Sequence, residues 1–364
     1  MLCTWLHNYK TMDNIQQDIK LTQYSRSAGC GCKIAPAVLQ QIIGAASAPA
    51  DARLLVGNAT SDDAAAYDLG NGTALIATTD FFMPIVDDAY QFGRIAAANA
   101  ISDVYAMGGT PILALAILGW PVDKLPAALA QQVLAGARAV CNEAGITLAG
   151  GHSIDTTEPV FGLSVNGTCA IDHLRKNNTA QEGDLLLITK PLGVGILATA
   201  HKRGLLAAEH YDTFIAQLAQ LNKIGTDLGG IPGVTALTDI TGFGLAGHLT
   251  EMATGSGLSA EISYSSLPVI AGATEYLSQR IVPDATYRNW NAYGPQIAFD
   301  AGVDVMQAFS LLPDPQTNGG LLVAVSPSAY DEVAALLQRH GLGHHAQPVG
   351  KMVARAEKLI TVKA

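Results

Sequence analysis

The sequence has few charged residues, few cysteines and no long uninterrupted hydrophobic run. Charged residues make up 14% of the 364-residue chain and hydrophobic residues 49%, which leaves ample apolar surface to bury and excludes an intrinsically disordered protein. The five cysteines are an odd number spread over a long chain, a pattern that is typical of reducing conditions rather than of a disulfide framework.

Two classes of interaction are excluded by what is missing. The most apolar stretch, residues 112–118 with its flanks, falls short of the roughly 20 residues that cross a bilayer, and the N-terminus has no signal-peptide pattern. A formal net charge of −10 provides no basic surface for nucleic acid, whose binding depends on Lys and Arg. We therefore expect a cytoplasmic protein with neither a membrane nor a nucleic acid as its partner.

The length favours two domains, since single domains usually contain roughly 100–200 residues. We interpret residues 1–53 as a mobile N-terminal arm with a Gly/Cys/Lys segment, residues 54–171 as a first α+β domain and residues 172–364 as a second. Alternating strand and helix patterns support this division. Strands are predicted at 73–79, 112–118, 160–169 and 185–189, and helices at 92–107, 125–144, 213–228 and 328–340.

Acidic residues stand at strand ends, at turns and on one helix face within otherwise apolar sequence. Asn99 and Asp103 are four residues apart, so they share one face of a helix. Any single aspartate could be a turn or cap residue. A buried carboxylate, however, must be hydrogen-bonded, paired or bound to a metal, and both a metal site and a hydrogen-bond network stay open here. The acidic set consists of Asp62, Asp63, Asp80, Asp103 and Asp239.

The glycine motifs do not identify a nucleotide site by themselves. Gly242, Gly244 and Gly247 form a G-x-G-x-x-G pattern, and Glu261 follows at about the distance of a ribose-binding acid. The segment before the pattern is more polar than a central strand and lies in mid-chain, so we disfavour nicotinamide or flavin binding. The chain also has no G-x-x-x-x-G-K-[ST] motif, so ATP, if it binds, is not held by a P-loop.

A C-x-C pair, Cys30 and Cys32, stands among glycines and is followed by Lys33. Zinc would require a second ligand pair, which the sequence does not provide. A neighbouring ammonium group lowers the pKa of a thiol and favours the reactive thiolate, so the segment fits a catalytic thiol as well as a structural or redox role.

A series of motifs covers roughly residues 21–322 in order. The segments are Leu-Thr-Gln-Tyr-Ser at 21–25, Gly-Cys-Gly-Cys-Lys-Ile at 29–34, Asp-Asp at 62–63, Thr-Thr-Asp-Phe-Phe at 78–82, Asn-Ala-Ile-Ser-Asp at 99–103, Gly-Gly-His-Ser at 150–153 and Thr-Asp-Ile-Thr-Gly-Phe-Gly at 238–244. Together they resemble the selenophosphate synthetases (selenide, water dikinases). The resemblance implies an α+β, two-domain aminoimidazole ribonucleotide synthetase-like (PurM-like) fold, with a homodimer built on the N-terminal sheets.

The resemblance also implies a reaction, ATP + selenide + water → selenophosphate + AMP + orthophosphate, which needs Mg²⁺ and supplies selenium for selenocysteine and selenouridine synthesis. ATP and selenide are the implied substrates, and a selenium-delivery protein is a candidate partner. Asn318 departs from the family pattern, which has serine there. By carry-over, Mg²⁺ is held by Asp63, Asp103 and Asp239, ATP is bound by Lys33, Thr60, Ser61, Asp62, Asp80, Gly151, His152 and Ser153, and the catalytic residues are Cys30 and Lys33.

Two alternative functions stay open. The first is another ATP-dependent synthetase or kinase of the same superfamily, against which the Gly-Cys-Gly-Cys-Lys segment argues. The second is a non-catalytic selenium- or metal-binding protein that keeps the fold, and the retention of every aspartate site together with Lys33 argues against it.

Overall fold

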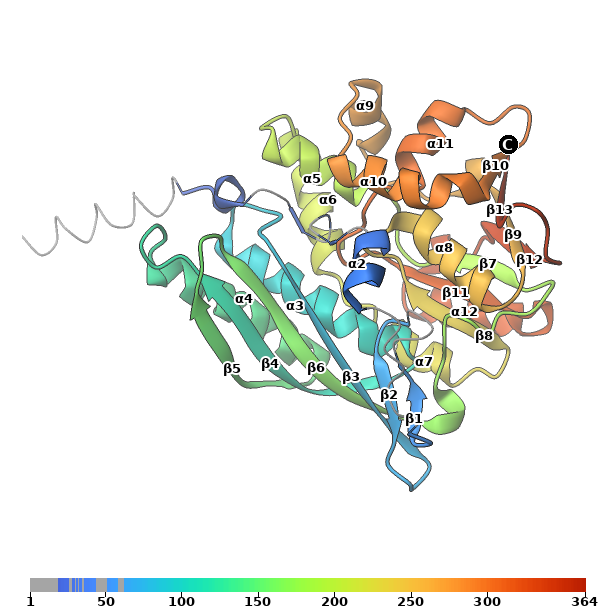
Figure 1. Ribbon diagram of the computed structural model, residues 1–364, viewed down its shortest axis with the longest axis horizontal. Coiled ribbons are helices and arrows are strands. Elements are labelled where there is room, and N and C mark those ends of the chain that lie inside the picture. Colours follow the sequence, from blue (N-terminus) through green and yellow to red (C-terminus); the bar gives the residue numbers. More distant parts are fainter. Residues whose placement is uncertain are drawn as a thin grey trace, which may run out of the picture.

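The structure, a computed structural model, describes residues 19–25, 28–29, 31, 33–34, 36–43, 51–57 and 62–364. Cys30, Thr60 and Ser61, which the resemblance assigns to the site, lie outside the described residues. Within the described part of the chain, no helix combines the length and the apolar character needed to cross a membrane. The architecture is of the expected α+β class, with two separate sheets and helices packed on them (Figure 1).

The N-terminal half forms a sheet of six strands in the order β1-β2-β3-β6-β4-β5. Neighbouring strands are antiparallel except for β4 and β5, which run parallel. The long central strands β3, β4 and β6 make the sheet a broad platform. The strands are β1 (Leu54–Val56), β2 (Ala65–Asp68), β3 (Thr73–Phe82), β4 (Thr110–Trp120), β5 (Thr147–Asp155) and β6 (Val160–Ala170).

The C-terminal half forms a second sheet, of seven strands in the order β10-β13-β9-β12-β7-β11-β8. Strand β11 is buried along its whole length, as expected for a continuous apolar run. Strand β8 is an edge strand and pairs antiparallel with β11. The strands are β7 (Leu185–Ile188), β8 (Val234–Asp239), β9 (Ser259–Ser263), β10 (Ile297–Phe299), β11 (Leu321–Val325), β12 (Gly350–Val353) and β13 (Ile360–Lys363).

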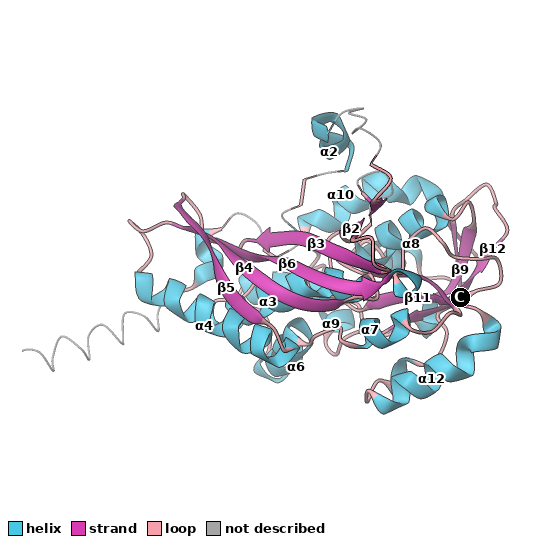
Figure 2. Cartoon of the chain, turned by 90° about the horizontal axis from the view of Figure 1, so that it is seen from below, coloured by secondary structure: helices cyan, strands magenta, loops and turns pink. Residues whose placement is uncertain are grey.

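The helices pack on both sheets and between them. The α-helices are α2 (Pro36–Ile43), α3 (Ala89–Ala106), α4 (Ala127–Ala144), α5 (Val194–Lys202), α6 (Ala208–Ala219), α7 (Ile224–Gly229), α8 (Gly244–Gly255), α9 (Ala273–Ser278), α10 (Asp284–Tyr293), α11 (Val305–Leu311) and α12 (Tyr330–Arg339). The 3₁₀ helices are η1 (Leu21–Tyr24), η3 (Ile171–His173), η4 (Tyr264–Ser266), η5 (Gly294–Gln296), η6 (Pro327–Ala329) and η7 (Gly343–His345). Figure 2 shows α2 standing away from the body of the molecule.

Helix α3 lies at the centre of the molecule, between the two halves (Figure 1). Every residue from Ile95 to Ala106 is buried. The reason is that α3 packs on β3, β4 and β6 on one side and contacts α6, α7 and β8 on the other. Polar side chains on a buried stretch of helix need a partner, either another protein group or a bound ion or water, so the polar residues of α3 must be paired.

The prediction of one continuous helix over residues 213–228 is wrong, because the structure has two helices, α6 and α7, with residues 220–223 between them. The backbone at this break accepts hydrogen bonds from residues that are distant in the sequence. Gln220 O accepts hydrogen bonds from Lys190 Nζ at 2.8 Å and from Asn318 Nδ2 at 2.9 Å. Such tertiary contacts override helix propensity. The remaining predicted strands and helices correspond to β3, β4, β6, β7, α3, α4 and α12.

Helices α3 and α4 approach each other at two glycines. A Cβ atom on Gly93 would lie 1.8 Å from Val133 O, and one on Gly136 would lie 2.0 Å from Tyr90 O. We expect Gly136→Ala to lower the free energy of unfolding by about 3 kcal/mol, because overpacking forces two backbones apart. Gly145→Ala, with nothing within 4 Å of the added Cβ, is the control and should cost about 1 kcal/mol from its positive φ alone. Urea denaturation measures the free energy of unfolding of both variants. Equal losses of stability would show that the close approach of α3 and α4 at Gly136 does not limit the size of the side chain there.

Candidate active site

Strand β3 and helix α3 bring carboxylates together because the spacing of side chains along the inner face of the strand matches the spacing along one face of the helix. Two residues along a strand and four along a helix both advance the chain by roughly 6–7 Å. Thr78 on the inner face of β3 therefore meets Asp103 on α3, and its Oγ1 donates to Asp103 Oδ2 at 2.5 Å. Two residues further along β3, Asp80 Oδ2 accepts a hydrogen bond from Asn99 Nδ2 at 2.7 Å. The helix and the strand thus hold two carboxylates in fixed positions.

Strand β8 brings two more carboxylates to the same place. Its last residue, Asp239, is 1% exposed and accepts a hydrogen bond from Ser102 Oγ of α3 at 2.5 Å. The neighbouring Thr238 donates through Oγ1 to Asp63 Oδ1 at 2.9 Å, which joins the segment before β2 to the C-terminal half. Asp63, Asp103 and Asp239 therefore converge where the two halves of the chain meet.

The converging carboxylates raise one another's pKa values. The pKa of Asp63 lies well above its usual range, first because of burial and then because of the charges of Asp239, Asp103 and Asp62. Burial, followed by the charge of Asp239, raises the pKa of Asp103 in the same way, and burial also raises that of Asp239. Asp62 itself accepts a hydrogen bond from Asn177 N at 2.7 Å. A group of buried like charges needs protons or a cation for balance.

Lys33 supplies positive charge beside this cluster. Its Nζ donates to Thr241 Oγ1 at 3.3 Å and lies 5.4 Å from the centre of the Phe243 ring. Its ammonium group lowers the pKa values of Asp103 and Asp239, against the larger effect of burial. Lys33, which ends the Gly/Cys/Lys segment, therefore lies close enough to these carboxylates to stabilise their ionised forms.

The hydrogen-bond network behind the carboxylates contains two residues, Lys190 and Asn222, that no motif indicated. Asn222 Nδ2 donates to Ser102 Oγ at 2.8 Å, and Asn318 N donates to Asn99 Oδ1 at 2.7 Å. Lys190 Nζ in turn donates to Asn318 O at 2.9 Å. Lys190 is 2% exposed, and burial lowers its pKa to about 7. The one available signal was a lysine placed directly after an apolar strand.

The backbone at position 318 accounts for asparagine at a place where the resemblance implies serine. Asn318 has a φ of +48°, in the left-handed region, which asparagine tolerates better than most residues. Its Nδ2 donates to Leu218 O at 2.7 Å and to Gln220 O at 2.9 Å. Serine would supply a single donor, so asparagine binds the loop before β11 to the end of α6 more completely.

A single chain does not bring Gly151, His152 and Ser153 to the carboxylates. All three are exposed on β5, the edge strand of the first sheet. Gly151 stands in the same row of paired residues as Asp80, with β4 and β6 between them. At roughly 4.8 Å per strand spacing, the two residues are about 14 Å apart.

The G-x-G-x-x-G pattern is not part of a dinucleotide fold. It joins β8 to α8, but β8 is an antiparallel edge strand and the next strand, β9, is not its neighbour. Glu261 on β9 lies 3.7 Å from Lys351 Nζ and 3.4 Å from Lys363 Nζ. A Cβ atom on Gly244 would lie 2.7 Å from Asp314 O, so this glycine permits close backbone packing.

The carboxylate oxygens of Asp63, Asp103 and Asp239 are the type of ligand that Mg²⁺ prefers. Asp63 Oδ2 is buried and has no hydrogen-bond donor among the described residues, so it can accept a cation. Among those same residues, no three His, Cys, Asp or Glu side chains lie close enough to enclose a metal ion on their own. Mg²⁺ commonly takes one or two carboxylates and completes its coordination with substrate phosphates and water.

Comparison with known proteins places the chain in a family. The models described as AIR synthase related protein, N-terminal domain, and AIR synthase related protein, C-terminal domain, match residues 61–169 and 181–363. A selenide, water dikinase of Photorhabdus laumondii is 53% identical over 326 residues, which cover 89% of this chain and 93% of that protein. Another, of Cronobacter sakazakii, is 54% identical over 329 residues, which cover 90% and 93%.

Solved structures share the fold at low sequence identity. Thiamine-monophosphate kinase from Stenotrophomonas maltophilia superposes with a TM-score of 0.61 at 18% identity, over 85% of this chain and 91% of that chain. Hydrogenase maturation protein HypE in complex with ATP superposes with a TM-score of 0.63 at 18% identity, over 97% and 91%. With this fold and with more than half of the aligned residues identical to those relatives, the chain belongs to the selenide, water dikinase family.

Proposed function

We propose that the protein makes selenophosphate from ATP, selenide and water, and releases AMP and orthophosphate. The observation that carries this proposal is that four aspartates meet Lys33 between the two halves of the chain, namely Asp63, Asp80, Asp103 and Asp239. Phosphoryl transfer depends mainly on positioning and charge neutralisation, for which such a site is suited. The cytoplasmic location inferred from the sequence belongs to the same proposal.

Each site residue has a proposed role in this reaction. Asp63, Asp103 and Asp239 would hold Mg²⁺, which when bound neutralises the phosphates of ATP. Lys33 steadies the phosphates, and Cys30 handles selenium. The nucleotide is bound with the help of Thr60, Ser61, Asp62 and Asp80.

We further propose a homodimer formed by the first sheets. The strand register places Phe81, Leu115 and Ile154 on the face away from α3 and α4, where they are 50%, 40% and 59% exposed. His152 is in register with Phe81 and projects from the same face. A second copy on this face would cover the apolar side chains, as exposed apolar patches often require. It would also bring residues 151–153 of one copy toward the nucleotide of the other.

Selenide-dependent AMP formation is the test of the function. Protein supplied with ATP and Mg²⁺ should release AMP only when selenide is added. ADP formation without selenide would instead identify a kinase of the same superfamily, and nucleotide binding without turnover would identify a non-catalytic protein. Labelled water should place its oxygen in the released orthophosphate, because selenide accepts the first phosphoryl group and water the second.

Cys30→Ala is expected to abolish selenide-dependent AMP formation, whereas Cys32→Ala should keep most of it. The reason is the role proposed for a thiolate at position 30, which a lysine three positions later in the sequence favours. Steady-state AMP release measures both variants. Cys32→Ala is the matched control, since it removes the same group two positions away. Full activity of Cys30→Ala would refute the proposed role.

A further inference from the structure

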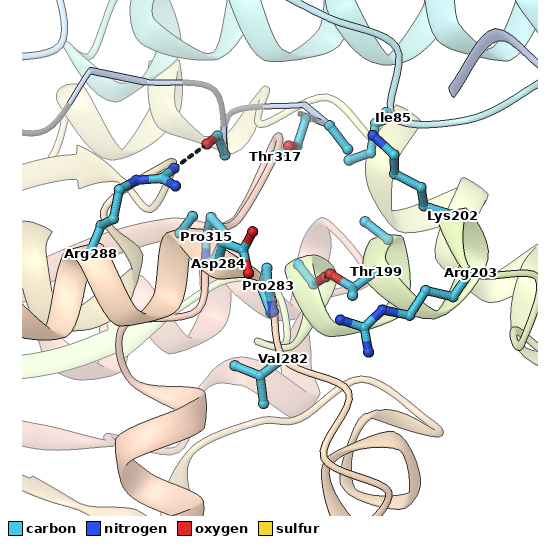
Figure 3. A pocket seen from close by; sticks show the side chains of 15 residues that line it. Ile85, Thr199, Lys202, Arg203, Val282, Pro283, Asp284, Arg288, Pro315 and Thr317 are labelled. Atoms are coloured by element: carbon cyan, nitrogen blue, oxygen red, sulfur yellow. Dashed lines mark hydrogen bonds between the residues drawn. The ribbon is translucent and has the colours of Figure 1, made fainter. Parts of the chain in front are cut away.

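A pocket of about 310 Å³ lies beside the N-terminal arm and has no part in the function proposed above. Its walls come from the end of α5, the beginning of α10 and the loop before β11 (Figure 3). Small-molecule pockets occupy roughly 300–1,000 Å³. This pocket is at the lower end of that range, so it fits a small ligand.

The lining of the pocket carries more positive than negative charge. Lys202 and Arg203 stand at the end of α5 and Arg288 stands on α10, whereas Asp284 is the one carboxylate among the described lining residues. Figure 3 shows Arg288 on one side of the pocket and Lys202 with Arg203 on the other. Three cationic groups favour an anion, and the planar guanidinium group of arginine matches an oxyanion in bidentate geometry.

Two of these cations also hold the arm. Arg288 Nη2 donates to Gly31 O at 2.6 Å, and Lys202 Nζ donates to Ser25 O at 2.8 Å. A guanidinium group has five N–H donors, so Arg288 can bind the arm and an anion together. Ala28 and Gly31 are themselves part of the lining, so the arm forms one edge of the pocket.

A single loop separates the pocket from the carboxylates. Thr317 lines the pocket, and the next residue, Asn318, donates its N–H to Asn99 of the active site at 2.7 Å. The arm packs closely on this loop, since a Cβ atom on Gly29 would lie 2.3 Å from Thr317 Oγ1. An anion that leaves the carboxylates therefore has a cationic pocket close by.

We propose that this pocket is a second oxyanion site, which receives a phosphate-class product of the reaction. Orthophosphate and the phosphorylated selenium compound are both small tetrahedral oxyanions, so the same cationic groups could hold either. The identity of the ligand as a product rests on the proposed function. Binding at this site places the product apart from the carboxylates, whose charge repels it.

The test uses inorganic phosphate and thiophosphate, the sulfur analogue of the selenium product. Each is titrated calorimetrically into the full chain saturated with Mg²⁺ and a non-hydrolysable ATP analogue, which occupy the active site. We expect Arg203→Gln to weaken binding about 10-fold or more, the effect of losing one charge-assisted hydrogen bond. Arg339→Gln, an exposed arginine of α12, is the matched control and should change affinity by less than about 2-fold.

Equal affinities of wild type and Arg203→Gln, or no binding by wild type, would overturn the site. Tighter binding of thiophosphate identifies the selenium product as the ligand, and tighter binding of phosphate identifies orthophosphate. Oxyanion binding by a protein that forms no AMP from selenide would refute the proposed function and the product role while the site remains. Normal AMP formation without oxyanion binding would refute this inference alone.

Discussion

Asp63→Asn is expected to abolish selenide-dependent AMP formation and, at the same time, to make the ligand-free protein more resistant to heat. Burial and the charges of Asp239 and Asp103 raise the pKa of the Asp63 carboxyl, so its ionised form is unfavourable without a bound cation. Asparagine keeps an acceptor for Thr238 but removes the charge. AMP formation should fall at least about 100-fold, a loss of roughly 3 kcal/mol in transition-state stabilisation.

Thermal unfolding with and without Mg²⁺ and ATP separates the two effects. Wild type should gain stability from Mg²⁺-ATP, because a ligand that binds only the folded state stabilises it, and Asp63→Asn should lose that gain. Without ligand, the midpoint of the variant should rise by roughly 1–2 °C for each kcal/mol of repulsion removed. Asp123→Asn, in an exposed turn, is the control and should change neither quantity. A lower ligand-free midpoint for Asp63→Asn would contradict the repulsion.

Asn99→Asp should lower the free energy of unfolding by about 3–5 kcal/mol, because it places an uncompensated charge in a buried position. Asn99 is fully buried, donates to Asp80 Oδ2 at 2.7 Å and accepts from Asn318 N at 2.7 Å. Aspartate keeps the second hydrogen bond but faces Asp80 with another carboxylate. Two like charges, one of them fully buried, would then lie in contact between the helix and the strand.

Urea denaturation followed by circular dichroism measures this loss. Asn71→Asp is the matched control, since Asn71 lies in an exposed turn where its Oδ1 accepts from Thr73 N at 3.1 Å and aspartate can do the same. Its effect should stay within about 0.5 kcal/mol. If Asn99→Asp unfolds at the same urea concentration as wild type, the contact with Asp80 does not secure α3 to β3.

The aspartates of the site could be predicted because the signals that mark them are local. Asp80 ends the strand-like run of residues 74–79, and the four-residue spacing of Asn99 and Asp103 is enough to place them on one helix face. The residues that fix their orientation carry no such signal. Lys190 and Asn222 belong to the C-terminal half, and they reach the site only because that half folds onto α3.

The difference between local sequence signals and long-range contacts also explains the two features that the sequence could not predict. The helix predicted at 213–228 is interrupted because Gln220 O accepts hydrogen bonds from residues far away in the chain, which propensity cannot show. Residues 151–153 were recognised by their motif, but their exposure on an edge strand follows from the sheet order. Local pattern therefore indicated the acidic residues that the structure brings together, whereas long-range pairing decides how they are arranged.

The pairing of α3 with β3 also limits how related chains can differ in length. One residue inserted between Asn99 and Asp103 would turn Asp103 by about 100° around the helix axis and advance it by about 1.5 Å. Asp103 would then lose its hydrogen bond with Thr78, while Asn99 would keep its hydrogen bond with Asp80. Insertions and deletions among relatives should therefore fall in the loops that flank this helix and this strand. They should be absent from the segment between Thr78 and Asp80 and from the segment between Asn99 and Asp103. An alignment of the relatives' sequences can check this rule.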